Sequence, residues 1–141
     1  LPEEALVRGI EIVLGRHVVA AHEEPTALRP PLSDDRQELA PHQGEERKTW
    51  IQAVRIGDVA VVGVPGEFFT RFGLDIKSRS PFRNTFVAAL ANDYIGYIPD
   101  QEAYGLGGYQ VWTGLHSLVA QGTGERIVDE ALDLLDELSR E

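Results

Sequence analysis

The chain has 141 residues and contains no cysteine and no methionine. The missing cysteines exclude a disulfide framework, a thiolate zinc site and a cysteine nucleophile, but they leave the cellular compartment open. The longest apolar run, residues 59–64, is far shorter than the roughly 20 residues that span a bilayer, so no transmembrane segment is predicted. Because the chain starts at Leu1 and has no signal-like segment, we expect a processed piece of a longer protein.

Basic residues are scarce, with 13 Lys and Arg against 23 Asp and Glu, which gives a formal net charge of −10. An acidic surplus of this size repels phosphate backbones, so nucleic-acid binding is excluded as a function. Hydrophobic residues make up 43% and charged residues 26% of the chain, which is enough apolar material for a folded core. We expect a single domain over residues 1–141.

The first third of the chain alternates regular and irregular segments. Pro2 and the following acids precede an apolar spacing of 3.6 residues, which predicts a helix over residues 3–14. A short strand-like run follows at residues 18–21. Residues 23–48 hold four prolines without apolar periodicity, which predicts a long surface excursion that is functional, disordered or laid across a partner.

The remainder predicts an α+β domain with a mixed or antiparallel sheet and flanking helices. Gly57-Asp58 separates two β-rich runs and is a hairpin signal. An amphipathic helix is expected from Thr123, its predicted N-cap, to the end of the chain. The elements expected between these are strands at residues 50–56, 59–64, 85–91 and 94–98, a helix at 68–79 and a helical turn at 101–104.

Several common catalytic arrangements are absent. No pair among the four histidines, His17, His22, His42 and His116, has zinc-motif spacing, so each is interpreted as a solvated or hydrogen-bonded side chain. The Gly-x-Ser-x-Gly motif of serine hydrolases is missing. The glycines at 105–108 follow a helical turn and lack a lysine, which favours a bend over a phosphate cradle.

Glu67 is the first candidate functional residue. It follows a strand in the turn Val64-Pro65-Gly66-Glu67-Phe68, where proline and glycine fix the backbone. A carboxylate held in this way can be a metal ligand or a general base. It can also be a first-turn acid that stabilises the helix N-terminus, and the residues by themselves favour this second interpretation.

The four tyrosines form the second candidate group, because all of them lie within residues 94–109, in a polar and glycine-rich setting. A tyrosine can donate a hydrogen bond to a developing oxyanion or, as a phenolate, complete a metal coordination shell. An aromatic surface cluster is the alternative interpretation. The four are Tyr94, Tyr97, Tyr104 and Tyr109.

These two groups together carry a resemblance to a known family. The turn around Glu67 is followed by Leu-Ala-Asn-Asp-Tyr-Ile-Gly-Tyr-Ile at residues 90–98, then by Glu-Ala-Tyr at 102–104 and Gly-Tyr at 108–109. In order and spacing these motifs resemble the neutral/alkaline non-lysosomal ceramidase family. The likeness runs over residues 50–109, with a looser fit of the C-terminal helix, so we expect residues 50–141 to form a ceramidase-like core.

The resemblance implies a zinc-dependent amidohydrolase that cleaves an N-acyl amide bond, with Zn²⁺ held by two histidines, a glutamate and a tyrosine. By position, Glu67 and Tyr97 match the glutamate and tyrosine ligands. Tyr109 matches a tyrosine that hydrogen-bonds the substrate carbonyl oxygen. The resemblance also implies that the chain is the C-terminal part of a larger catalytic domain, and it favours a secreted or periplasmic protein.

The sequence departs from the family pattern in ways that leave alternatives open. The family's zinc histidines lie upstream of the glutamate motif, and neither His17 nor His22 has a matching context, so we expect an upstream chain or segment to supply them. Gly96 stands where ceramidases often have histidine, and the residues after the expected C-terminal helix leave no room within these 141 for the family's immunoglobulin-like C-terminal domain. The substrate is therefore either ceramide or another acylated amine. The alternative function is a non-catalytic binding or scaffold module that retains the fold without metal.

Overall fold

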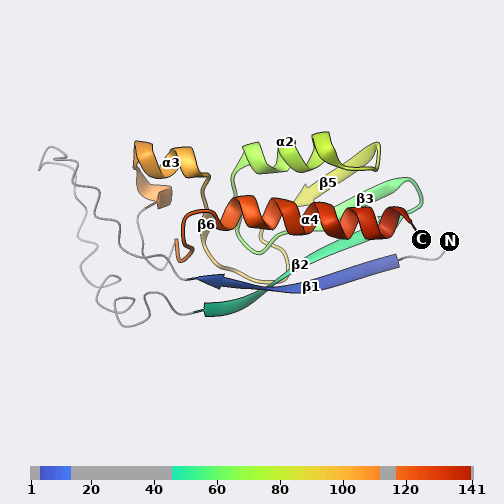
Figure 1. Cartoon of the computed structure of the whole chain (residues 1–141), viewed down its shortest axis with the longest axis horizontal. Coiled ribbons are helices and arrows are strands. Elements are labelled where there is room, and N and C mark those ends of the chain that lie inside the picture. Colours follow the sequence, from blue (N-terminus) through green and yellow to red (C-terminus); the bar gives the residue numbers. More distant parts are fainter. Residues whose placement is uncertain (1–3, 14–45, 112–116, 141) are drawn as a thin grey trace, which may run out of the picture.

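The computed structural model describes residues 4–13, 46–111 and 117–140 (Figure 1). Among these residues, four strands precede the first helix, and Figure 1 shows an elongated molecule with α4 running along it. The elements are β1 (Glu4–Val13), β2 (Glu46–Ile56), β3 (Val59–Gly63), β4 (Glu67–Phe68), α2 (Thr70–Arg79), β5 (Asn84–Ala88), β6 (Tyr97–Ile98), α3 (Gln101–Leu106), the 3₁₀ turn η2 (Tyr109–Val111) and α4 (Thr123–Ser139).

The main sheet has the strand order β1-β2-β3-β5. The β1-β2 and β2-β3 pairs are antiparallel, whereas β5 is parallel to β3. Parallel neighbours need a crossover connection, and here α2 provides it. A second, two-stranded sheet pairs β4 with β6 in parallel. The predicted α+β class with a mixed sheet and flanking helices is therefore confirmed.

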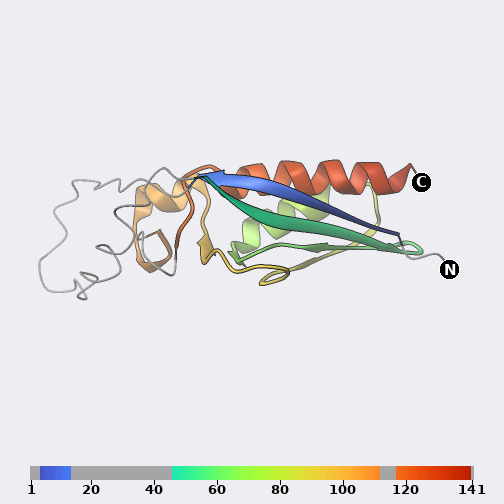
Figure 2. The ribbon, with the colours of Figure 1, turned by 90° about the horizontal axis from the view of Figure 1, so that it is seen from below.

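Both long helices lie on one face of the main sheet (Figure 2). The core lies between them and the sheet, because alternate residues of β2 and β3 face the helices and are buried: Ile51, Ala53, Ala60 and Val62. From α2 the core receives Phe72 and Ile76. From α4 it receives a full apolar stripe that includes Ile127, Ala131, Leu134, Leu135 and Leu138, the residues on which this helix was predicted.

The helix predicted over residues 3–14 is wrong, because residues 4–13 form strand β1. This strand pairs with β2 along its whole length, from Glu4 opposite Arg55 to Val13 opposite Glu46. The apolar spacing suits a helix, but the segment is also rich in β-branched residues, which favour a strand, and Gly9 at its centre weakens a helix. Pairing with a partner distant in sequence decides between the two.

The other sequence predictions vary in accuracy. The hairpin at Gly57-Asp58 is confirmed. The helix predicted from residue 68 begins at Thr70, because Phe68 pairs with β6 instead. The strand predicted at 85–91 is shorter and mostly exposed, since β5 is an edge strand. Thr123 does not cap α4; Gly122 does, in a left-handed conformation with φ of 90°.

The predicted strand at 18–21 lies outside the described residues. The same holds for most of the excursion predicted at 23–48, except that residues 46–48 belong to β2. Within the part of the chain that the structure describes, no helix is both long and apolar enough to cross a membrane.

Candidate functional site

The turn after β3 is fixed by main-chain hydrogen bonds to the segment between β5 and β6. Val64, Pro65 and Gly66 are buried, and the carbonyls of Val64, Pro65 and Gly66 accept hydrogen bonds from the amides of Ala91, Ile95 and Leu90 at 2.9, 2.9 and 3.1 Å. The amides of Val64 and Glu67 donate in return to the carbonyls of Ala88 and Gly96, each at 2.9 Å. The backbone that carries Glu67 is therefore held rigidly to the backbone that leads to Tyr97.

Two glycines allow this close approach. A Cβ atom at Gly66 would collide with the carbonyl oxygen of Gly96 and come within 2.9 Å of the Ile98 side chain. Gly96 itself has a φ of 78°, in the left-handed region that favours glycine. The glycine that stands at position 96 therefore matches the backbone conformation there.

Glu67 and Tyr97 lie side by side. They are direct partners in the parallel β4-β6 pair, so their side chains emerge on the same side of the small sheet. Hydrogen bonding to the Glu67 carboxylate is the main cause that raises the pKa of Tyr97, followed by desolvation and the negative charge of Glu67. The phenol is thus held in its neutral, proton-donating form.

This placement also settles the capping interpretation of Glu67. The helix α2 begins three residues later at Thr70, has no acidic residue in its first turn and has Phe69 at its N-cap without a side-chain hydrogen bond. Glu67 is consequently not a first-turn acid. Its carboxylate is directed to Tyr97 instead.

Tyr109 completes the group that was selected from the sequence. Its ring packs edge-on against the ring of Tyr97, with 5.7 Å between centroids and an interplanar angle of 80°. Tyr109 is 50% exposed, so half of its surface can be reached from solvent. We call Glu67, Tyr97 and Tyr109 the Glu67-Tyr97 corner.

The remaining tyrosines differ from each other. Tyr94 is exposed and adds only a small electrostatic contribution that raises the pKa of Tyr97. Tyr104 is directed to the segment before α4, where its hydroxyl donates to the carbonyl of Val119 at 3.2 Å. Burial, and secondarily the charge of Glu125, raises the pKa of Tyr104 to about 12. Tyr104 is therefore a packing residue.

Asn92-Asp93 lies between the predicted strands at 85–91 and 94–98, and the structure anchors it by a contact that the sequence does not reveal. The hydroxyl of the buried Thr49 on β2 donates to Oδ2 of Asp93 at 2.8 Å, and Oδ1 of Asp93 accepts from the amide of Tyr94. Leu90 and Asn92 have φ of 57° and 70°, which is unusual outside glycine. A tight turn before the tyrosines was readable from Asn-Asp, but the contact with Thr49 was not.

The donors of the corner suit part of a zinc site. A carboxylate is a regular zinc ligand, and a neighbouring phenol can join it after losing its proton. Two oxygen donors are half of a tetrahedral set. Among the described residues no cluster of three or more His, Asp or Glu side chains could hold a metal. His17, His22, His42 and His116 all lie outside the described residues.

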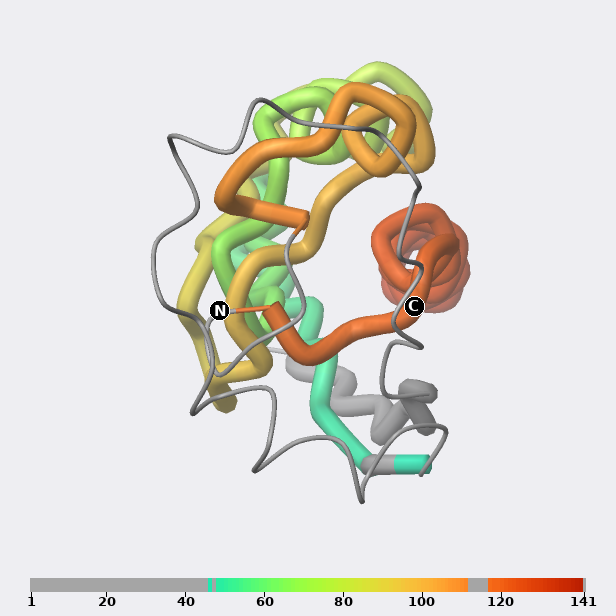
Figure 3. The backbone as a smooth tube through the Cα atoms, turned by 90° about the vertical axis from the view of Figure 1, so that its left-hand side faces the viewer, coloured from blue at the N-terminus to red at the C-terminus, as the bar shows by residue number. Residues whose placement is uncertain are grey.

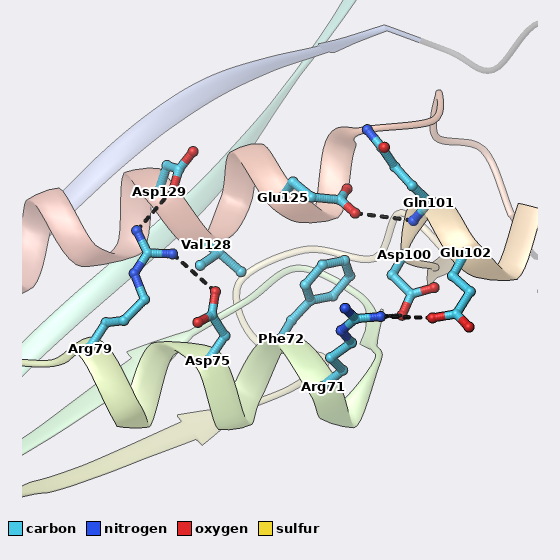
Figure 4. A pocket seen from close by; sticks show the side chains of 10 residues that line it. All are labelled: Arg71, Phe72, Asp75, Arg79, Asp100, Gln101, Glu102, Glu125, Val128 and Asp129. Atoms are coloured by element: carbon cyan, nitrogen blue, oxygen red, sulfur yellow. Dashed lines mark hydrogen bonds and ion pairs between the residues drawn. The ribbon is translucent and has the colours of Figure 1, made fainter.

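A separate cleft of about 730 Å³ opens between α2, α3 and α4 (Figure 4). Seen along α4, α2 and α3 lie together on one side of it (Figure 3). Arg71 pairs there with Glu102 at 3.0 Å and with Asp100 at 3.5 Å, while Arg79 pairs with Asp75 and Asp129 at 3.0 and 3.4 Å. No residue of the Glu67-Tyr97 corner lines this helix cleft.

Comparison with known proteins adds the fold relationship. No protein-family model matches the chain. Two solved structures match with probability 1.00: a neutral ceramidase from Pseudomonas aeruginosa (TM-score 0.63, 17% identity, 97% of this chain and 28% of that chain) and a ceramidase complexed with C2 (TM-score 0.61, 18% identity, 99% and 30%). The chain thus spans about three tenths of the length of either protein. The resemblance predicted from the motifs is confirmed at the level of the fold.

Proposed function

We propose that this chain is part of a ceramidase-like, zinc-dependent amidohydrolase that cleaves an N-acyl amide bond. The supporting observation is that Glu67, Tyr97 and Tyr109, selected from sequence motifs, meet at one corner. They do so in a fold shared with neutral ceramidases. Three residues from separate elements that converge in this way are better explained by a common site than by packing, because Tyr109 remains half exposed.

Glu67 and Tyr97 are the residues of this chain that would hold the metal. A zinc ion supplies Lewis acidity and lowers the pKa of its bound water toward 7. Glu67 offers a carboxylate oxygen, and its pairing with Tyr97 across β4 and β6 keeps the two oxygens close without a flexible loop between them. To hold the metal as a phenolate, Tyr97 would have to lose its proton, and the hydrogen bond to Glu67 that raises the pKa of Tyr97 opposes this loss while no metal is bound.

Tyr109 has the position of a hydrogen-bond donor to the substrate. Its ring is held by the edge-on contact with Tyr97, and its exposed side is accessible to an incoming amide. A phenol hydroxyl held there can donate to the amide carbonyl oxygen as negative charge develops on that oxygen. Two further ligands, which we assign to histidines of an upstream segment or chain, complete the set. The substrate class is ceramide or another acylated amine.

The test uses the protein at its natural length, with zinc measured by elemental analysis and hydrolysis measured on ceramide and on simpler N-acyl amides. We expect Glu67→Ala to lose the metal. Tyr109→Phe should keep the metal and slow turnover by about 10²-fold, the scale of a lost oxyanion donor. Glu102→Ala is the matched control, because this exposed carboxylate lies in the helix cleft; it should change neither property.

Two outcomes would overturn the proposal in different ways. Equal metal loss in Glu67→Ala and Tyr109→Phe would contradict the separate roles of ligand and donor. A natural-length protein without zinc and without amidase activity, but with a stable binding partner, would instead establish the scaffold module.

A further inference from the structure

No described helix covers the face of the main sheet opposite α2 and α4 (Figure 2), and only its end at Gly63 is covered, by Ala91 and Asn92. Burial alternates along the strands, so residues next to the buried Ile51, Ala53, Ala60, Val62 and Thr85 point to this side. Trp50 is 43% exposed and Phe86 57% exposed. We call this the open face. Its apolar side chains are Trp50, Val54, Ile56, Val59, Val61 and Phe86.

The strand register makes these side chains neighbours. Val54 lies opposite Val61, which in turn lies opposite Phe86, so three strands contribute to one row. Ile56 lies opposite Val59 next to this row. A continuous apolar row across a sheet is typical of a face that is buried in the working protein, because a solvated sheet face carries mostly polar side chains.

We propose that the open face is the docking surface for a further polypeptide segment of the same protein, outside these 141 residues, that presents an apolar surface. In the ceramidases that share this fold, the match takes 28% and 30% of the chain, so most of their polypeptide lies outside it. A second copy of this chain is disfavoured as the occupant, since each copy carries a net charge of −10.

The chain connects the open face to the Glu67-Tyr97 corner, with Ala91 and Asn92 lying over Gly63 between the two. The parallel strands β3 and β5 end at the same edge, where Gly63 lies opposite Ala88. From there β3 leads through the buried turn to Glu67, and β5 leads through the Asp93 turn to Tyr97. A segment docked beside these strand ends lies next to the corner. The inference rests on the proposed function only in assigning the two metal histidines to this docked segment.

Hydroxyl-radical footprinting of the natural-length protein measures whether the face is covered. Leu74 on α2 is the matched control, because it is 61% exposed on a helix rather than on the sheet. After correction for intrinsic reactivity, we expect Trp50 and Phe86 to be labelled about tenfold less than Leu74, as in the centre of a protein interface. Labelling of all three at rates set by their exposure would overturn the inference.

Photocrosslinking then identifies the occupant. With benzoylphenylalanine in place of Phe86, we expect an adduct to a peptide of the same protein outside these 141 residues. An adduct to residues 14–45, or to a second copy of the chain, would overturn the inference. These readouts need neither zinc nor activity. The expected adduct in a protein without zinc and amidase activity would therefore reject the proposed function and retain the docking surface. Zinc and amidase activity in a protein whose open face is fully labelled would retain the proposed function and reject the docking surface.

Discussion

The Glu67-Tyr97 corner and the helix cleft are held together by different interactions. In the corner, buried backbone bonds join the turn after β3 to the segment before β6, and two glycines permit the close approach. In the helix cleft, Arg71 and Arg79 form ion pairs with exposed carboxylates on neighbouring helices. The helix cleft is the more visible cavity, but the backbone of the Glu67-Tyr97 corner is the more rigid of the two.

This difference teaches where to expect a positioned functional group. Exposed ion pairs contribute little because they lose side-chain entropy and are screened by salt. Buried main-chain hydrogen bonds fix the direction of a side chain to within the tolerance that catalysis and metal binding require. The volume of a hollow is therefore a weaker indicator of function here than the rigidity of its walls.

The largest expected effect is that of Gly66→Ala. Its Cβ would meet the backbone carbonyl of Gly96, which cannot move without separating β4 from β6. We expect the free energy of unfolding to fall by about 3 kcal/mol, measured by urea denaturation. The matched control is Gly105→Ala in α3, where no atom lies within 4 Å of the added Cβ; it should be neutral or slightly stabilising. Equal losses in both variants would contradict the close-approach argument.

Thr49→Val tests the anchor of the turn before Tyr97. It removes the hydroxyl that donates to Asp93 from a buried position on β2. We expect a loss of about 1.5–3 kcal/mol in the free energy of unfolding, the usual contribution of a hydrogen bond to a charged group. Thr49→Ser, which keeps the hydroxyl, should lose less. An unchanged free energy of unfolding in Thr49→Val, which keeps the methyl group and lacks only the hydroxyl, would contradict a role for this hydrogen bond.

Tyr104→Phe tests the hydrogen bond from the Tyr104 hydroxyl in α3 to the carbonyl of Val119. The pKa of Tyr104 is raised to about 12, first by burial and then by the charge of Glu125. Its contribution to stability is therefore fully present below about pH 10, where the unfolded chain keeps the phenol neutral, and is lost as the pH rises through 12. We expect Tyr104→Phe to cost about 1 kcal/mol at pH 8, and this difference to shrink steadily between pH 10 and 12. A constant difference across this range would show that Tyr104 does not titrate as stated.

Much of the fold could be predicted because the patterns are local. The stripe of α4 and the Gly57-Asp58 turn each specify one structure within a short window, and both are confirmed. In contrast, residues 4–13 fit a helical spacing, and only pairing with β2 makes them a strand. Phe68 likewise continues the stripe of α2 in sequence but pairs with β6 in space.

In the candidate site, too, local patterns could be read from the sequence and contacts between distant segments could not. The motif resemblance selected Glu67, Tyr97 and Tyr109, and the structure brings them together, although their metal and substrate roles stay predictions. The residues by themselves favoured helix capping for Glu67, because the two residues of β4 could not be recognised without β6. Periodicity also could not show that one sheet face lacks a cover, because that depends on which side the helices pack.

The smallest expected effect is that of Arg71→Ala in the helix cleft. Arg71 and its partner Glu102 are both exposed, so we expect a loss of about 0.5 kcal/mol at low salt that disappears near 1 M salt. Asp100→Ala should cost more, about 1 kcal/mol at either salt concentration, because Asp100 also caps α3 by accepting from the amide of Ala103 at 2.9 Å. A loss above 2 kcal/mol for Arg71→Ala, or a fall in amide hydrolysis, would mean that the cleft and not only the corner is built for function.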